Sequence, residues 1–306
     1  MNENVKKIID NIEKIIIGKR NVIEHLMVAL LSEGHVLIED VPGVGKTQVV
    51  GALAKSVDGA FNRIQFTPDI MPSDVVGFSM FDSEKREFTY KPGVVMCNFL
   101  LADEINRSSP KCQSSLLEVM EEFQVTVDGK IHDIPRPFMV LATENPVEHQ
   151  GTYKLPEAQM DRFLLKVSMG YPNKEEEKLI LDRFESKNPL KELESIITIE
   201  ELINMQEQVK EVIIFDNIKY YIVDLIQETR KNSKVLVGIS PRGGISLLKA
   251  AKSLAYIRGR DYVIPDDIQE MAVPVLAHRL ILKSSIGTTN EEIIKETIKN
   301  VEVPLY

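Results

Sequence analysis

Apolar residues recur every three or four positions at the start of the chain. Positions 5, 8, 9, 12, 15 and 16 are all valine or isoleucine, which is the spacing of a helix that buries one face. Gly18 interrupts the pattern, and a second run with the same period covers residues 21–32. We therefore expect two amphipathic helices joined at a glycine.

Short apolar runs then alternate with helical stretches. Because such alternation is typical of a parallel sheet with helices on both faces, the pattern predicts an α/β fold. Two hairpin-like insertions interrupt the alternation, one at 88–95 and one at 124–134, where Asp128-Gly129 is a strong turn signal. The expected strands are residues 36–39, 63–66, 99–102, 139–143 and 164–168.

The strand pattern stops near Gly170. A helix is expected at 171–184, a polar stretch follows it, and from there the chain is predicted to be helical to its end. Thr198 and Glu201, in capping-box spacing, mark one of these helix starts. The predicted division is an α/β core, a linker region and an all-α C-terminal lid domain, at residues 1–172, 173–196 and 197–306.

Composition narrows the class of protein. The 306 residues are 43% apolar and 27% charged, which fits a globular chain of about two domains. The net charge of −9 disfavours non-specific nucleic-acid binding. Cys97 and Cys112 lack metal-ligand spacing, and no apolar run approaches the ~20 residues that span a bilayer. With no signal-peptide pattern, we expect a cytoplasmic protein without membrane insertion.

The run VLIEDVPGVGKT at 36–47 carries the strongest chemical signal. An apolar strand leads into a glycine loop, then Lys46, Thr47 and an amphipathic helix, which is the layout of a phosphate-binding loop. Backbone N–H groups there surround the β-phosphate, Lys46 reaches the β- and γ-oxygens, and the Thr47 hydroxyl binds Mg²⁺. Gly43 and Gly45 give the loop its backbone freedom.

One position departs from this motif. The pattern G-x-x-x-x-G-K-[ST] places glycine where this chain has Asp40, whereas Pro42 fixes one loop dihedral. A carboxylate about 4 Å from a phosphate would cost several kcal/mol in a partly buried site. We therefore predict that Asp40 points away from the phosphates.

Two further strands end in polar residues. FLLADE at 99–104 ends in Asp103, suited to holding the water shell of Mg²⁺, and Glu104, suited to polarising an attacking water. FMVLATEN at 138–145 ends in Asn145, a candidate to contact the γ-phosphate or that water. Each of these signals alone is common, but their order after a phosphate loop favours nucleotide hydrolysis.

Together these features resemble an AAA+ ATPase, and several blocks resemble the MoxR family in particular. The likeness covers roughly residues 5–283, and the two hairpins are similar to the helix-2 and pre-sensor-1 inserts of that branch. The blocks are LIEDVPGVGKT (37–47), FTPDIMPSDVVG (66–77), LLADEINRSSPKCQSSLLEVMEE (100–122), LATENP (141–146), LPEAQMDRF (155–163) and SPRGG (240–244).

The resemblance implies roles for individual positions. Asn145 resembles sensor 1, and Arg242 resembles sensor 2, which reaches from the lid back to the γ-phosphate. Arg162 resembles the arginine finger that enters a neighbouring subunit's site. Without the family, Arg162 reads as a surface arginine and Arg242 as a first-turn ion-pair residue. The positions matching the nucleotide contacts are Ile17 and Gly18, which flank the adenine, and Pro42, Gly43, Val44, Gly45, Lys46, Thr47 and Gln48.

The resemblance also implies a function, namely ATP hydrolysis to ADP and phosphate with Mg²⁺. A finger supplied in trans implies a ring, by family analogy a homo-hexamer. The ring would remodel, mature or insert metal into partner proteins such as von Willebrand A-domain proteins. Two alternatives stay open at this point: a nucleic-acid-acting AAA+ motor, and a nucleotide-gated scaffold with weak turnover caused by Asp40.

Overall fold

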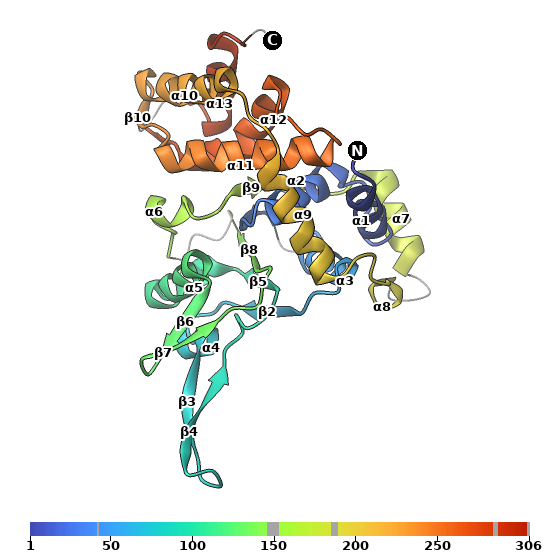
Figure 1. Cartoon of the computed structure of the whole chain (residues 1–306), viewed down its shortest axis with the longest axis vertical. Coiled ribbons are helices and arrows are strands. Elements are labelled where there is room, and N and C mark those ends of the chain that lie inside the picture. Colours follow the sequence, from blue (N-terminus) through green and yellow to red (C-terminus); the bar gives the residue numbers. More distant parts are fainter. Residues whose placement is uncertain (42, 146–152, 185–188, 284–286, 305–306) are drawn as a thin grey trace.

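The structure is a computed structural model, and it describes residues 1–41, 43–145, 153–184, 189–283 and 287–304. Its centre is a five-stranded parallel sheet with helices on both faces, so the predicted α/β fold with a helical lid is confirmed (Figure 1). In spatial order the strands are β2 (Phe61–Gln65), β5 (Phe99–Asp103), β8 (Met139–Glu144), β1 (Val36–Glu39) and β9 (Leu165–Val167).

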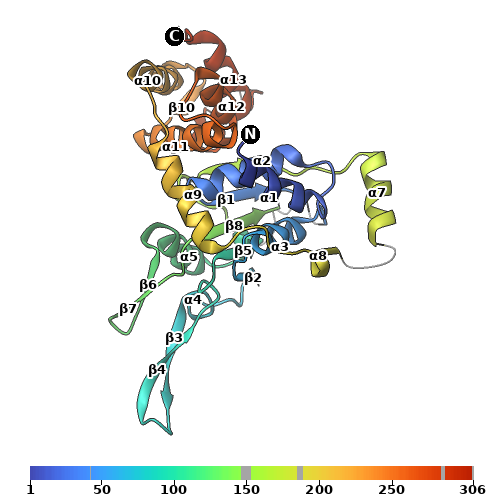
Figure 2. The same cartoon turned by 45° about the vertical axis from the view of Figure 1, so that its right-hand side comes forward.

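Alternate side chains of the strands enter two separate apolar cores, one on each face of the sheet. In β5, Phe99 and Leu101 pack on one face, and Leu100 and Ala102 pack on the other. Figure 2 shows the helices α3 and α5 on opposite sides of the strands. The first core is covered by α1 (Glu3–Glu13), α2 (Arg20–Leu31) and α3 (Lys46–Ser56), the second by α4 (Pro72–Val76) and α5 (Pro110–Glu122).

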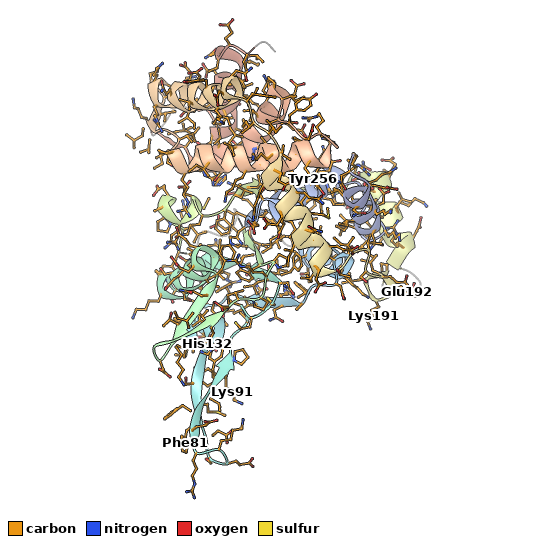
Figure 3. All side chains as sticks on the ribbon, in the orientation of Figure 1. Phe81, Lys91, His132, Lys191, Glu192 and Tyr256 are labelled. Carbon is orange, nitrogen blue, oxygen red and sulfur yellow. The ribbon has the colours of Figure 1, made fainter. Side chains whose placement is uncertain are left out.

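Two hairpins extend from the sheet domain on the side away from the lid (Figure 1). The longer pairs β3 (Gly77–Asp82) with β4 (Glu87–Pro92), and the shorter pairs β6 (Gln124–Val127) with β7 (Lys130–Asp133). The Tyr90 and His132 rings stack at 3.9 Å and join the hairpins near their bases. Figure 3 places Phe81 towards the far end of the longer hairpin.

The prediction for the shorter hairpin is confirmed, because Asp128 and Gly129 have the positive φ angles of its turn. The prediction of a hairpin within 88–95 is wrong. Residues 87–92 form only its second strand, and the first strand is β3. Gly93 lies instead at the base of the hairpin, where an added Cβ would lie 2.2 Å from the Val75 carbonyl oxygen.

The C-terminal part is a group of helices that packs on one end of the sheet domain. The prediction that it is entirely helical is wrong, because β10 (Val235–Val237) pairs with β11 (Ile281–Leu282) in a small antiparallel sheet. Helix α6 (Glu157–Met160) precedes β9, and α7 (Lys174–Phe184), α8 (Pro189–Glu192) and α9 (Ile199–Glu211) follow it in the chain. The lid helices in the described ranges are α10 (Asp216–Lys231), α11 (Pro241–Ile257), α12 (Pro265–Leu276) and α13 (Asn290–Asn300). Short 3₁₀ turns lie at Ile105–Arg107, after β5, and at Ala277–Arg279, after α12.

Helix α9 joins the two parts. Its start is capped as predicted, since Thr198 and Glu201 exchange side chain to backbone hydrogen bonds. The buried Gln206 amide donates to the Leu30 carbonyl of α2 at 2.7 Å, and Gln208 accepts from the Tyr256 hydroxyl of α11 at 2.6 Å (Figure 3). The lid is therefore held against the sheet domain by polar contacts as well as by the shared core.

Candidate functional site

Three strand ends meet at one edge of the sheet. Strand β8 lies between β1 and β5, and all three are parallel, so the residues that follow them emerge side by side. The Asp40 N–H donates to the Glu144 carbonyl at 3.1 Å, which fixes the start of the phosphate loop beside the end of β8. The structure therefore brings the loop, the acidic pair and Asn145 to the same carboxyl edge.

The phosphate loop borders open space. Gly43 and Gly45 have φ angles of +87° and +90°, and a Cβ built on either would meet no atom within 4 Å. Helix α3 begins at Lys46, so its first N–H groups point towards that space. The Lys46 ammonium donates to the Asp40 carbonyl at 3.1 Å. These features fit the binding of a polyphosphate. Pro42, which was also predicted to belong to this loop, lies outside the described residues.

Asp40 is turned away from the loop, as the sequence predicted. Its buried carboxylate accepts hydrogen bonds from the backbone N–H groups of Met169 and Gly170, the second at 3.0 Å, and from the Ser168 hydroxyl at 3.3 Å. Three donors on one carboxylate compensate its removal from water. Asp40 thus ties the end of β1 to the chain that leaves β9, and its carboxylate is bonded to that chain and not to the phosphate loop.

The acidic pair at the end of β5 is fixed by a threonine from β8. The Thr143 hydroxyl donates to Asp103 Oδ1 at 2.6 Å and accepts from the Glu104 N–H at 2.8 Å. The other Asp103 oxygen, Oδ2, accepts from Arg63 of β2 at 2.7 Å. Carboxylate and hydroxyl oxygens are ligands that suit Mg²⁺, so Asp103 together with Thr47 fits the predicted metal role. Sequence reasoning missed Thr143, which lies inside an apolar strand run.

Glu104 has an unusual backbone for a non-glycine residue. Its φ angle is +55°, in the left-handed region, which costs of order 1–3 kcal/mol and is common at active sites. Its Oε2 accepts from the Gln65 amide and from the Arg107 guanidinium, both at 2.9 Å. Arg107 belongs to the 3₁₀ turn Ile105–Arg107 that follows β5. Asn145, at the end of β8, is only 7% exposed.

A cavity of about 230 Å³ adjoins the loop, on the side of the N-terminal helices. Its aliphatic walls suit a flat nucleobase. Gly18 does not line the cavity but lies against Glu176 of α7, whose Oε1 would be 1.9 Å from an added Cβ. Helix α7, expected in the linker region, therefore closes this side. The predicted residues that line it are Ile17, Gly43, Val44, Gly45 and Gln48, and those that sequence reasoning missed include Met169, Pro172 and Ile180.

The two arginines lie elsewhere. Arg162 Nη2 forms an ion pair with Glu121 Oε2 at 3.0 Å, and Arg242 Nη2 donates a hydrogen bond to Glu121 Oε1 at 3.2 Å. Glu121 is in the last turn of α5, next to Met120, whose carbonyl is 2.9 Å from Nε2 of His35 at the start of β1. This cluster is therefore at the amino edge of the sheet. Arg242 was expected to reach back to its own γ-phosphate, but the structure pairs it with Arg162.

A buried arginine explains this pairing. Arg279, with 2% of its side chain exposed, donates to Asp161 Oδ1 at 2.7 Å and to the Phe163 carbonyl at 2.7 Å. Burial lowers the pKa of Arg279, and the charge of Asp161 opposes that shift. Asp161 also accepts from the Ser240 hydroxyl, at the start of α11, at 3.5 Å. The lid is thus pinned to the segment that carries Arg162. In Figure 1, α6 lies between α11 and α5.

Within the described ranges there is no group of three or more histidine, cysteine, aspartate or glutamate side chains placed to hold a metal ion. None of the helices in those ranges is long and apolar enough to cross a bilayer.

Known proteins resemble this chain over its whole length. The family profile described as "ATPase family associated with various cellular activities (AAA)" matches residues 35–165, and an AAA lid domain profile matches residues 227–297. The Mycobacterium tuberculosis protein "Chaperone MoxR1" is 43% identical over 97% of this chain and 80% of its own length. The uncharacterized Bacillus subtilis protein YeaC is 51% identical over 98% of this chain and 94% of its own length.

The fold comparison agrees. A crystal structure from Cytophaga hutchinsonii, provisionally described as an ATPase, has a TM-score of 0.93 and 38% sequence identity, covering 99% of this chain and 95% of that one. Protein MoxR of Methylorubrum extorquens is 29% identical over 95% of this chain and 91% of its own length. With the phosphate loop and the acidic pair at one edge and an AAA lid beyond, the chain belongs to the MoxR family of AAA+ ATPases.

Proposed function

We propose that this protein hydrolyses ATP to ADP and phosphate and uses the energy for chaperone-like remodelling of partner proteins. The observation that carries the proposal is the carboxyl edge, where the open glycine loop with Lys46 follows β1 and the pair Asp103 and Glu104 ends β5, with β8 between these two parallel strands. Phosphoryl transfer needs positioning and charge neutralisation more than covalent chemistry, and this edge offers both.

Each residue then has one task. The loop N–H groups and Lys46 bind the β- and γ-phosphates, and Ile17 and Gln48 contact the base and sugar side. Thr47 and Asp103 would hold Mg²⁺, which neutralises phosphate charge when bound. Glu104 polarises the attacking water, and Asn145 orients it. The bonds from Gln65 and Arg107 hold the Glu104 carboxylate in a fixed direction until substrate competes for it.

The two arginines at the amino edge lie too far from the phosphate loop of their own subunit to reach its nucleotide. Strands of four to six residues separate the two sheet edges by roughly 13–20 Å, which is longer than an arginine side chain. Arg162 and Arg242 therefore serve the γ-phosphate of a neighbouring subunit. An interface that repeats head to tail forms a ring when its rotation closes, and a homo-hexameric ring is our proposal.

The proposed partner proteins rest on the family to which the chain belongs and not on a contact in the structure. The name of MoxR1 supports a chaperone role, and a von Willebrand A-domain protein remains our proposed client in a cytoplasmic setting. The division into a core at 1–172, a linker at 173–196 and a lid at 197–306 is part of this proposal. A nucleic-acid motor is not favoured, because the shorter hairpin carries Lys130 and His132 beside two aspartates.

ATP turnover measured over a range of protein concentrations tests the proposal. Activity per subunit should rise as rings form and then level off, with Glu104→Gln as the inactive control. Absence of turnover at every concentration would reject the ATPase and leave the nucleotide-gated scaffold. If turnover is found, a pull-down with the Glu104→Gln protein, which should bind ATP without hydrolysing it, identifies the client protein.

A further inference from the structure

Glu121 is the one carboxylate that contacts both Arg162 and Arg242 in the described structure. We propose that Glu121 is a positioning residue that holds these two arginines as a pair for delivery to the neighbour's γ-phosphate. The inference rests on the proposed function, since it concerns how the arginines of that function are presented. No motif in the sequence points to it, because its partners lie 41 and 121 residues away.

The contact geometry indicates that Glu121 positions the two arginines and does not block them. Neither arginine makes a bidentate pair of hydrogen bonds with Glu121 in the described structure: Arg242 donates one hydrogen bond to Oε1, and Arg162 forms an ion pair with Oε2 at 3.0 Å. A guanidinium carries five N–H donors, so most of the donors on both arginines remain for a phosphate. A contact that blocked the arginines would instead use the bidentate geometry that arginine and carboxylate readily adopt.

The charges of Arg162, Arg242 and Glu121 also favour a positioning role for Glu121. Arg162 and Arg242 approach one carboxylate closely enough to repel each other if that carboxylate were removed. Glu121 offsets one of the two positive charges, and the pair together with Glu121 keeps a net charge of about +1. A γ-phosphate from the next subunit would therefore meet two arginines held at a fixed separation.

Glu121 has a rigid base and an accessible side chain. Its neighbours Val119 and Met120 are buried, and the Met120 carbonyl is hydrogen-bonded to His35. The Glu121 side chain itself is 39% exposed. A substitution of Glu121 should therefore change the arginine cluster without disturbing the fold. Glu118, one turn earlier on the same helix, is exposed and makes no ion pair with any described residue.

The test compares Glu121→Ala and Glu121→Gln with Glu118→Ala in steady-state ATPase assays on the full chain. Glu121→Ala should lower kcat roughly tenfold or more, the scale of one charge-assisted hydrogen bond, while KM for ATP and ring assembly stay near wild type. Glu121→Gln should lie between, because its amide keeps one acceptor oxygen. Glu118→Ala should match wild type. An unchanged or raised kcat in Glu121→Ala, or an equal loss in Glu118→Ala, overturns the inference.

Mixing subunits separates positioning from damage to the variant's own site. Glu121→Ala subunits have an intact phosphate loop, and Lys46→Ala subunits have an intact arginine cluster. Mixed rings should therefore be more active than the sum of the two variants measured separately. A mixture of Arg162→Ala with Lys46→Ala runs in parallel. If that mixture recovers and the Glu121 mixture does not, only this inference fails. If neither recovers, the proposed action in trans fails as well.

Discussion

The two edges of the sheet are built in different ways. The carboxyl edge collects the phosphate loop, Asp103 and Glu104, each placed by the strand directly before it. The amino edge collects its charged groups from distant segments and from both the sheet domain and the lid: Glu121, Asp161, Arg162, Arg242 and Arg279. In our account, the first edge receives a nucleotide, and the second completes the site of the next subunit.

The largest effect is expected at the amino edge, from Arg162→Ala. Arginine fingers contribute roughly 10³–10⁵ in rate in other phosphoryl-transfer enzymes. The variant should bind ATP with near wild-type affinity and turn it over at least about a thousandfold more slowly. Fluorescent-nucleotide titration and phosphate release measure the two properties. Arg86→Ala, an exposed arginine in the turn of the longer hairpin, is the control. Weakened ATP binding in Arg162→Ala would place the residue in its own site.

At the carboxyl edge, Lys46→Ala and Glu104→Gln should separate binding from chemistry. Lys46→Ala should lose tight ATP binding, because the loop loses its cation. Glu104→Gln should keep binding and lose roughly 10²–10⁴ in turnover, because an amide cannot polarise the water. Binding by calorimetry and turnover by phosphate release check both. Equal loss of nucleotide affinity in the two variants contradicts this division of roles.

The difference between the edges explains what the sequence could predict. The loop, the acidic pair and all five sheet strands follow from local patterns, with strand boundaries that differ from the prediction by at most two residues. Arg162 and Arg242 were identified only through a family resemblance, and their shared partner Glu121 was not identified at all. Such contacts depend on how the lid packs, and no local pattern encodes the bond from Arg279 to Asp161. The start of the longer hairpin was missed because β3 lacks a clear alternation of apolar and polar residues.

The amino edge also carries a predicted pH sensitivity. Burial lowers the pKa of His35 to about 4, from 6.5, so the folded protein holds this ring neutral between Met120 and Val140. The unfolded chain binds a proton there below pH 6.5 and the native state does not, so stability falls as the pH drops from 6.5 towards 4. From this group alone the free energy of unfolding should fall by about 2 kcal/mol by pH 5.

His35→Gln provides the comparison. Its amide can donate to the Met120 carbonyl and accept from the Val140 N–H, and it does not titrate. Urea unfolding at pH 7 and pH 5 should show that the variant loses about 2 kcal/mol less than wild type on acidification. Equal losses in both proteins would mean that His35 is already protonated in the folded state.

The smallest effect on nucleotide affinity is expected from Asp40→Gly, which restores the usual motif. Because the Asp40 carboxylate bonds the backbone after β9 and not the loop, ATP affinity should change less than tenfold. Stability should fall by about 1–3 kcal/mol, since the Met169 and Gly170 N–H groups lose their acceptor. Calorimetric titration and thermal unfolding measure the two. A hundredfold gain in affinity would show that Asp40 restrains binding and would favour the scaffold.

The central claim is that Arg242 and Arg162 act together on the neighbour's nucleotide. The most direct measurement is the ATPase activity of Arg242→Ala mixed with Lys46→Ala. If Arg242 acts in trans, the Lys46→Ala subunit supplies it to the intact loop of its neighbour, and part of the lost activity returns. If Arg242 instead acts in the site of its own subunit, every site in a mixed ring lacks either Lys46 or Arg242. Activity that stays at the level of the separate variants would contradict the account.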